Sequence, residues 1–160
     1  MAGGAAEDVA EARPVLESMG AQIFETGQLG SGQAVKALNN LLSAGTLALT
    51  IETLLLGKAW GLDPGRLNAI LNVSTGRNNS TDKKVVQHIL SRGFGSGFSL
   101  AFMDKDVRTA MALVEGAEAI APLSAAATAR LGEAVRALPS DADHTAIAQA
   151  IEAAAGITLD

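Results

Sequence analysis

Residues 31–60, SGQAVKALNNLLSAGTLALTIETLLLGKAW, form one long and mostly apolar segment of helical character. The segment contains no proline, and the turn signals Gly61 and Asp63-Pro64 follow it directly. Its larger apolar side chains spread around the whole circumference of a helix: Val35, Leu38, Leu41, Leu42, Leu47, Leu49, Ile51, Leu54, Leu55 and Leu56. A helix that is apolar on every side belongs in the middle of a bundle. The sequence therefore predicts an all-α fold, a helical bundle around a long central helix at about residues 30–60.

The rest of the chain predicts shorter elements around this helix. Apolar periodicity and turn residues indicate helices at 7–18, 64–73, 81–92, 99–119, 122–138 and 142–155. Pro14 is expected to kink or divide the first of them, because proline lacks the N–H that a helix interior needs. The stretch AQIFET (21–26), between Gly20 and Gly27, predicts a single strand without an evident partner.

Composition and charge argue against several classes of protein. The chain has 160 residues, 48% of them hydrophobic and 18% charged, which suits one globular domain. Its net charge of −5 argues against nucleic-acid binding, which needs clustered Lys and Arg. The absence of cysteine excludes disulfides and thiolate metal sites, and His88 and His144 lack carboxylates at metal-ligand spacing, so no metal is expected. The longest uncharged apolar stretch, 37–51, is shorter than a membrane span of roughly 18 residues.

Two glycine-rich stretches invite comparison with nucleotide-binding loops, and both fail. A P-loop needs Gly-Lys followed by Ser or Thr, whereas Lys36 lies between Val35 and Ala37. The dinucleotide fingerprint Gly-x-Gly-x-x-Gly begins at Gly30, but Val35 stands where the third glycine is needed. The stretch GFGSGF (93–98) fails in the same way. No nucleotide cradle of either kind is expected in this chain.

Lys36 and Asn40 need another explanation. They are four residues apart, so they share one face of the long helix near its N-terminus. A lysine on so apolar an element is expected to lose hydration, and desolvation lowers a lysine pKa toward the range of a general acid or base. Alternatively, Lys36 extends to solvent from the helix end and has no chemical role. Spacing alone leaves both readings open.

A wider pattern resembles one family. GQLGSGQAVKALNN (27–40) is similar to the hinge-and-helix segment of the β-hydroxyacid dehydrogenases, which include 3-hydroxyisobutyrate dehydrogenase and tartronate semialdehyde reductase. WGLDPGRLNAILNVSTGRNNS (60–80) resembles the family's second helical segment, and GFSLAFMDKDVRTA (97–110) resembles the segment that carries a second lysine. The matches run in family order and cover nearly the whole chain, with a helical domain like the C-terminal domain of 6-phosphogluconate dehydrogenase.

The resemblance implies a division of the chain. Members of the family open with a Rossmann domain that carries the glycine fingerprint and a Ser-Gly-Gly substrate loop. Residues 1–28 resemble only the end of that domain, so they are expected to form a short α/β remnant of a truncated Rossmann domain. Residues 29–160 are expected to form the helical substrate-binding and dimerisation domain.

The resemblance also implies the chemistry. The family transfers hydride reversibly between NAD or NADP and a small hydroxy acid or semialdehyde. It gives Lys36 the role of catalytic general acid/base, Asn40 that of a substrate-binding residue and Lys105 that of a cofactor-binding residue. The fragment lacks the nucleotide fingerprint, so it is expected to be inactive alone.

The expected partners are a small hydroxy acid and further copies of the same chain, associated as a dimer or larger homo-oligomer through the helical domain. Neither nucleic acid nor membrane is expected as a partner, and a cytoplasmic enzyme is expected. The alternative is a stand-alone module without catalysis that dimerises or binds a small acid. A split enzyme, in which a second chain brings the Rossmann half, is a third possibility.

Overall fold

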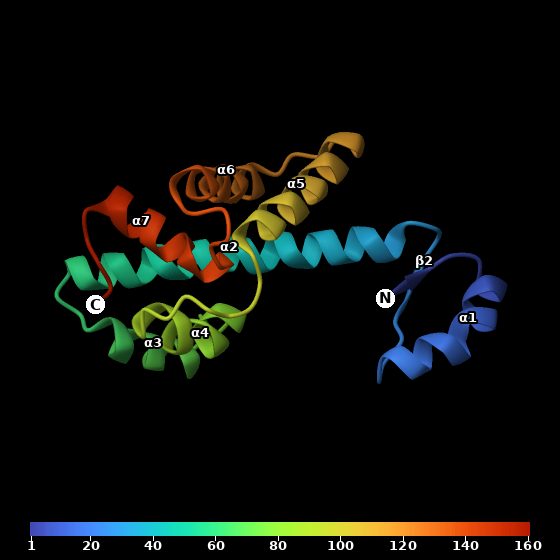
Figure 1. The fold of residues 1–160 in the computed structure, drawn as a ribbon, viewed down its shortest axis with the longest axis horizontal. Helices are drawn as coiled ribbons and strands as arrows, with labels where there is room; N and C mark the ends of the chain where they lie inside the picture. Colours follow the sequence, from blue (N-terminus) through green and yellow to red (C-terminus); the bar gives the residue numbers. More distant parts are fainter.

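The computed structural model describes all 160 residues and is built along one helix, α2 (Ser31–Ala59). Figure 1 shows α3 and α4 on one side of α2, with α5, α6 and α7 on the other and the N-terminal elements at one end. The remaining elements are β1 (Ala2–Gly3), α1 (Ala6–Met19), β2 (Glu25–Gly27), α3 (Pro64–Asn72), α4 (Asn79–Lys83), η1 (Val85–Leu90), α5 (Leu100–Gly116), α6 (Pro122–Ala137), η2 (His144–Ala146) and α7 (Ile147–Ala155). The predicted fold class, a helical bundle around a long central helix with a small α/β piece, is confirmed.

The core forms where the other helices cover α2. Ile51 and Leu54 are fully buried, and Leu47 is 2% exposed. They pack with side chains from α5, α6 and α7 in one continuous cluster. Small residues such as Ala44 at the contacts let neighbouring helices come close to α2.

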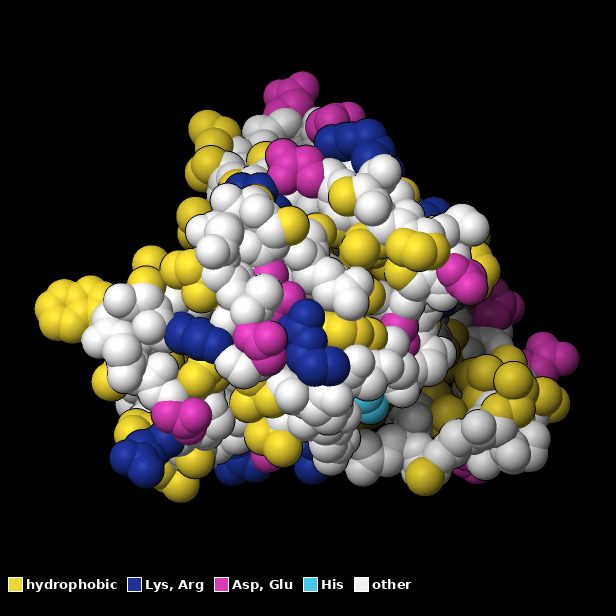
Figure 2. Space-filling view, turned by 60° about the vertical axis from the view of Figure 1, so that its left-hand side comes forward, with side chains coloured by type: hydrophobic (Ala, Val, Ile, Leu, Met, Phe, Trp, Pro, Cys, Tyr) yellow, Lys and Arg dark blue, Asp and Glu magenta, His cyan; other side chains and the backbone are white.

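One stripe of α2 is not covered, so the expectation that the helix is buried on every side is wrong. Leu42, Leu49 and Leu56 are 69%, 63% and 68% exposed. They recur every seven residues and therefore lie along one side of the helix. Apolar side chains are also visible elsewhere on the surface, among charged groups of both signs (Figure 2).

Both ends of α2 are set by glycines in left-handed backbone conformations. Gly30 at the N-terminus has a φ of +90°, and Gly61 just beyond the C-terminus has a φ of +85°. Both conformations favour glycine because it has no Cβ. Ser31 is the first helical residue, and its hydroxyl lies 2.7 Å from Oγ1 of Thr26. The side chain of Ser31 therefore ties α2 to β2.

The N-terminal piece is a β–α–β unit at the start of α2. β1 and β2 pair in parallel, with Ala2 opposite Glu25, and the N–H of Ala2 donates to the carbonyl of Phe24 at 2.8 Å. The predicted strand at 21–26 is therefore shifted and shortened, and it has a partner within the chain. Pro14 lies inside α1 and does not divide it, and a kink at Pro14 stays a prediction.

The predicted helix at 81–92 is two elements. α4 ends at Lys83, and after Lys84 the chain continues as a single π-helical turn, η1. Such turns place side chains differently from an α-helix and are frequent at functional sites. Here the change of winding occurs at Lys84.

By length and composition alone, α2 could cross a membrane. Half of its most apolar 18-residue window is buried inside the bundle. This is the behaviour expected of a core helix, as the sequence predicted for this segment.

The core position of Leu54 gives a direct test of the fold. Leu54→Ala should lower the free energy of unfolding by about 2–5 kcal/mol, because it removes buried apolar atoms and leaves a cavity. Urea unfolding followed by circular dichroism measures this. The matched control is Leu29→Ala, because Leu29 is 88% exposed. Equal effects of the two substitutions would contradict the assigned core.

Candidate active site

Asp106 on α5 joins α2 to α5 at the centre of the candidate site. One carboxylate oxygen of Asp106 accepts a hydrogen bond from Nδ2 of Asn40 at 2.7 Å. The other lies 2.7 Å from Nζ of Lys105. The structure thus brings the predicted residues Asn40 and Lys105 onto the two oxygens of one carboxylate.

Lys36 completes this group. It lies one turn before Asn40 on α2, and its charge acts on the carboxyl of Asp106. With Lys105 and Asp106 it lines a cavity of about 190 Å³ between the start of α2 and α5. The group Lys36, Asn40, Lys105 and Asp106 is called the lysine cluster below.

The lysine cluster holds Asp106 in its ionised form. The hydrogen bond from Lys105 is the largest influence and lowers the pKa of Asp106, with smaller contributions from Asn40 and from the charge of Lys36. Burial acts in the opposite direction but does not outweigh them. The result is one carboxylate beside two ammonium groups, so the cluster is positive overall.

Lys36 is not desolvated in this chain, contrary to the expectation from its helix. Its side chain is exposed, because the apolar packing of α2 begins at Ala37 and Leu41. Lys36 also lines a second cavity, with Gly3 and Gly30, between the β–α–β unit and α2. The side chain therefore faces the end of the molecule where the N-terminal piece lies.

Sequence reasoning missed Asp106 as the organiser of the site and missed Lys84 entirely. Lys84 follows α4 and is half-buried, and its Nζ donates to Oγ of Ser43 at 3.2 Å. Burial lowers its pKa, against a smaller effect of Asp143. In the sequence, the adjacent pair Lys105-Asp106 could have indicated Asp106, and the pair Lys83-Lys84 could have indicated Lys84.

Asp143 anchors the glycine-rich stretch 93–98 beside this region. Its carboxylate accepts hydrogen bonds from the backbone N–H groups of Gly97 and Phe98 and from the hydroxyl of Ser96. It also accepts from the N–H and hydroxyl of Thr145. These bonds tie the 93–98 stretch to the residue just before η2.

The N-terminal unit does not fit the phosphates of a dinucleotide. In a β–α–β unit the phosphates lie at the N-terminus of the helix, where the dipole favours negative charge. The first turn of α1 carries Glu7 and Asp8 instead. Gly3 is needed for another reason, since a Cβ there would come within 2.8 Å of the carbonyl of Gln28.

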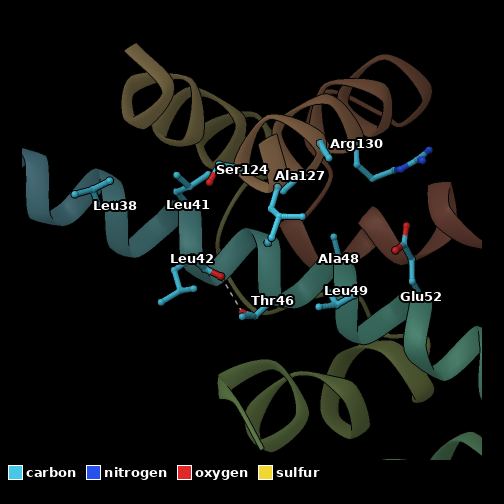
Figure 3. Close-up of a pocket in the computed structure, with 13 residues that line it drawn as sticks. Leu38, Leu41, Leu42, Thr46, Ala48, Leu49, Glu52, Ser124, Ala127 and Arg130 are labelled. Carbon is cyan, nitrogen blue, oxygen red and sulfur yellow. Dashed lines mark hydrogen bonds between the residues drawn. The ribbon is translucent and has the colours of Figure 1, made fainter. Parts of the chain in front are cut away.

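A larger apolar groove of about 460 Å³ lies between α2 and α6, with Leu38, Leu42, Leu49, Glu52 and Arg130 along it (Figure 3). It holds no side chain of the lysine cluster. No group of three or more His, Asp or Glu side chains in the structure could hold a metal ion.

Residues 30–151 match the family model described as NAD-binding of NADP-dependent 3-hydroxyisobutyrate dehydrogenase. The chain belongs to the 3-hydroxyisobutyrate dehydrogenase family of β-hydroxyacid dehydrogenases. This confirms the resemblance drawn from the sequence motifs.

Individual relatives agree with the family match. The chain is 40% identical over 131 residues to 3-hydroxyisobutyrate dehydrogenase of Pseudomonas aeruginosa, covering 78% of this chain and 44% of the relative. It is 38% identical over 127 residues to 2-(hydroxymethyl)glutarate dehydrogenase of Eubacterium barkeri, covering 79% of this chain and 42% of the relative. The chain thus spans less than half the length of these relatives.

Among solved structures, 3-hydroxyisobutyrate dehydrogenase of Mycobacterium tuberculosis with L-serine superposes with a TM-score of 0.82 at 30% identity. The match covers 93% of this chain and 53% of that one. At family level, therefore, the chain is related to NAD-dependent hydroxyacid dehydrogenases.

Asp106→Asn tests the bridge between α2 and α5. Because the pKa of Asp106 is lowered in the folded state, ionised Asp106 stabilises the fold above its unfolded pKa. That stabilisation is lost as pH falls through the lower folded pKa. The substitution should therefore cost about 1–3 kcal/mol at pH 7, and the difference from the unsubstituted chain should shrink toward pH 2.

Urea unfolding at pH 7, 4 and 2 measures this difference. Asp141→Asn is the control, because Asp141 is exposed and has no hydrogen-bond or ion-pair partner. A difference between Asp106→Asn and the unsubstituted chain that does not change with pH would contradict the charged bridge.

Proposed function

We propose that this chain is the acid–base and substrate-binding part of an NAD(P)-dependent β-hydroxyacid dehydrogenase that interconverts a small hydroxy acid and its oxo form. The observation that carries the proposal is the lysine cluster, in which Asp106 holds Asn40 and Lys105 beside Lys36. The family membership supports the same reaction class.

Lys36 is the general acid/base in this proposal. An ammonium at the substrate oxygen donates a proton as negative charge develops there during reduction, and the neutral amine takes the proton back during oxidation. The exposure of Lys36 means that this role requires a cover that excludes water. A nucleotide-binding half seated against the β–α–β unit would provide that cover.

Asn40 positions the substrate. Its Nδ2 is held by Asp106, which fixes the orientation of the carboxamide. Oδ1 accepts from Nδ2 of Asn39 at 3.3 Å and has a second lone pair for a substrate hydroxyl. The side chain is only half-buried, so a substrate beside Lys36 can reach it. Asp106 is a positioning residue in this scheme.

Lys105 is proposed to contact the cofactor. Its side chain is 66% exposed although it is paired to Asp106, so its ammonium can also bind an oxygen of a ligand outside the bundle. A bound nicotinamide cofactor supplies or accepts the hydride. Because the first turn of α1 is acidic, the cofactor phosphates must be held by another part of the enzyme, and the chain alone is proposed to be inactive. Cytoplasmic placement and the choice between NAD and NADP stay predictions.

Lys36→Ala tests the central role. In the chain supplied with the nucleotide-binding half of a homologous dehydrogenase, it should lower kcat by about a hundred- to ten-thousand-fold, the usual contribution of a general acid/base. Cofactor affinity, measured by NAD(P)H fluorescence titration, should remain within twofold. Lys105→Ala is the matched comparison, which should weaken cofactor binding by about tenfold.

Unchanged turnover in Lys36→Ala would remove the acid/base from this site. The alternative function, a non-catalytic module for dimerisation or small-acid binding, would then be favoured. Tight NAD(P)H binding by the 160-residue chain itself would contradict the proposed division of labour.

Association with a second copy through α2 is part of the proposal. Val35, Leu38, Leu42, Leu49 and Leu56 are each at least 40% exposed, and they lie three, four, seven and seven residues apart, on one side of the helix. The adjoining groove beside α6 is apolar as well (Figure 3). An apolar stripe of this length is typical of an interface.

Light scattering after size exclusion should give a dimer of the 16.2 kDa chain. Leu49→Glu should convert it to a monomer, because a charge in the seam would be buried without a partner. Val73→Glu is the control, since Val73 is 87% exposed and lies outside the stripe. A monomeric unsubstituted chain would contradict the proposed interface.

A further inference from the structure

A second groove, of about 430 Å³, adjoins the lysine cluster at Asn40. It is lined by Lys83 at the end of α4, Lys84 between α4 and η1, His88 of η1 and His144 of η2. No Asp or Glu lines it, although the chain has a net charge of −5. A groove with this lining attracts anions in an otherwise acidic protein.

Lys84 has unused bonding capacity in this groove. Its ammonium carries three donors, and the structure gives Nζ one partner, Oγ of Ser43 at 3.2 Å. No carboxylate lies within ion-pair distance of Lys84, whereas Lys83 is 3.8 Å from Asp82. The nearest acid acting on Lys84, Asp143, is already engaged by the 93–98 stretch and Thr145. A half-buried ammonium without a counter-ion needs an anion more than an exposed one does.

His144 lines the same wall but offers the anion no hydrogen-bond donor. The side chain is 5% exposed, and Nδ1 lies 3.2 Å from the carbonyl oxygen of Phe98 and 3.0 Å from Oγ of Ser96. A carbonyl can only accept, so Nδ1 carries the proton and Nε2 is unprotonated. Nε2 is buried and has no partner. An unprotonated ring nitrogen has no proton to donate, so Nε2 cannot bind a carboxylate or a phosphate, and the lysines of this wall must bind the anion.

The groove continues the line of the lysine cluster along α2. Ser43, which binds Lys84, is seven residues from Lys36, or about 10 Å along the helix axis. Asn40 belongs to both the lysine cluster and the groove. A short carbon chain whose hydroxyl lies at Lys36 would therefore place its far end near Lys84.

We propose that this groove around Lys84, called the Lys84 groove, binds a second anionic group of the substrate. The substrate class is then a hydroxy acid with a second carboxylate or phosphoryl group. This proposal rests on the proposed function for the position of the reacting hydroxyl. The anion site itself depends on Lys84, with Lys83 and His88 on the same wall.

Binding to the 160-residue chain tests the groove without any need for turnover. Two-dimensional ¹H–¹⁵N NMR titrations would compare glutarate, a dicarboxylate, with butyrate, its monocarboxylate counterpart of similar length. Glutarate should bind at least tenfold more tightly and shift the amide signals of Ser43, Val85 and Thr145. Lys84→Met should remove this preference, and Lys84→Gln should do the same if the methionine variant does not fold.

Arg136→Met is the matched control, because it removes one positive charge from an exposed position on α6. It should leave glutarate binding within twofold. Inorganic phosphate, titrated separately, distinguishes a phosphoryl from a carboxylate preference.

Equal affinity for glutarate and butyrate, or undiminished binding to Lys84→Met, would overturn the proposal. Its failure can be told apart from failure of the proposed function. Loss of turnover in Lys36→Ala with no glutarate preference would leave the dehydrogenase and remove the second-anion site. Glutarate binding at Lys84 with unchanged turnover in Lys36→Ala would support the second-anion site and remove the proposed acid/base.

Discussion

The burial of α2 is the constraint on which the rest of the structure depends. A 29-residue helix this rich in leucine and alanine cannot stand alone in water, so the other helices pack along it. Ile51 and Leu54 are fully buried at the centre, and the core ends toward Ala37. The side chains proposed to be functional lie where this packing ends, at the accessible end of the helix.

The hydrogen bond between Asn40 and Asp106 organises the proposed site. It crosses from α2 to α5 at the edge of the core. A carboxylate in this position also accepts from Lys105 and faces Lys36, so a single residue couples helix packing to the electrostatics of the cluster. Asp106 therefore contributes both to the contact between α2 and α5 and to the charge of the lysine cluster.

The exposure of Lys36 and the acidic first turn of α1 both bear on where a cofactor could be held. An acid/base group works best where water is excluded, and Lys36 is open on the side of the β–α–β unit. Glu7 and Asp8 oppose phosphate binding at the helix that would otherwise receive it. These features favour a chain that supplies proton transfer and substrate contacts, with the cofactor held elsewhere. The Lys84 groove would add substrate selection on the opposite side of Asn40.

The sequence by itself determined the central helix, its glycine boundaries and the placement of Lys36 and Asn40 on one face of it. Apolar periodicity and four-residue spacing are local properties of one helix. It also identified Lys105 and the family, since those motifs are short and contiguous. Only the tertiary structure decided that β1 pairs with β2, that a stripe including Leu42 and Leu49 stays uncovered, and that Lys36 is exposed. The roles of Asp106 and Lys84 also required it, because they depend on Asn40 and Ser43, which are 66 and 41 residues away in sequence. Contacts of that kind are set by how helices pack, and no periodicity along the chain encodes them.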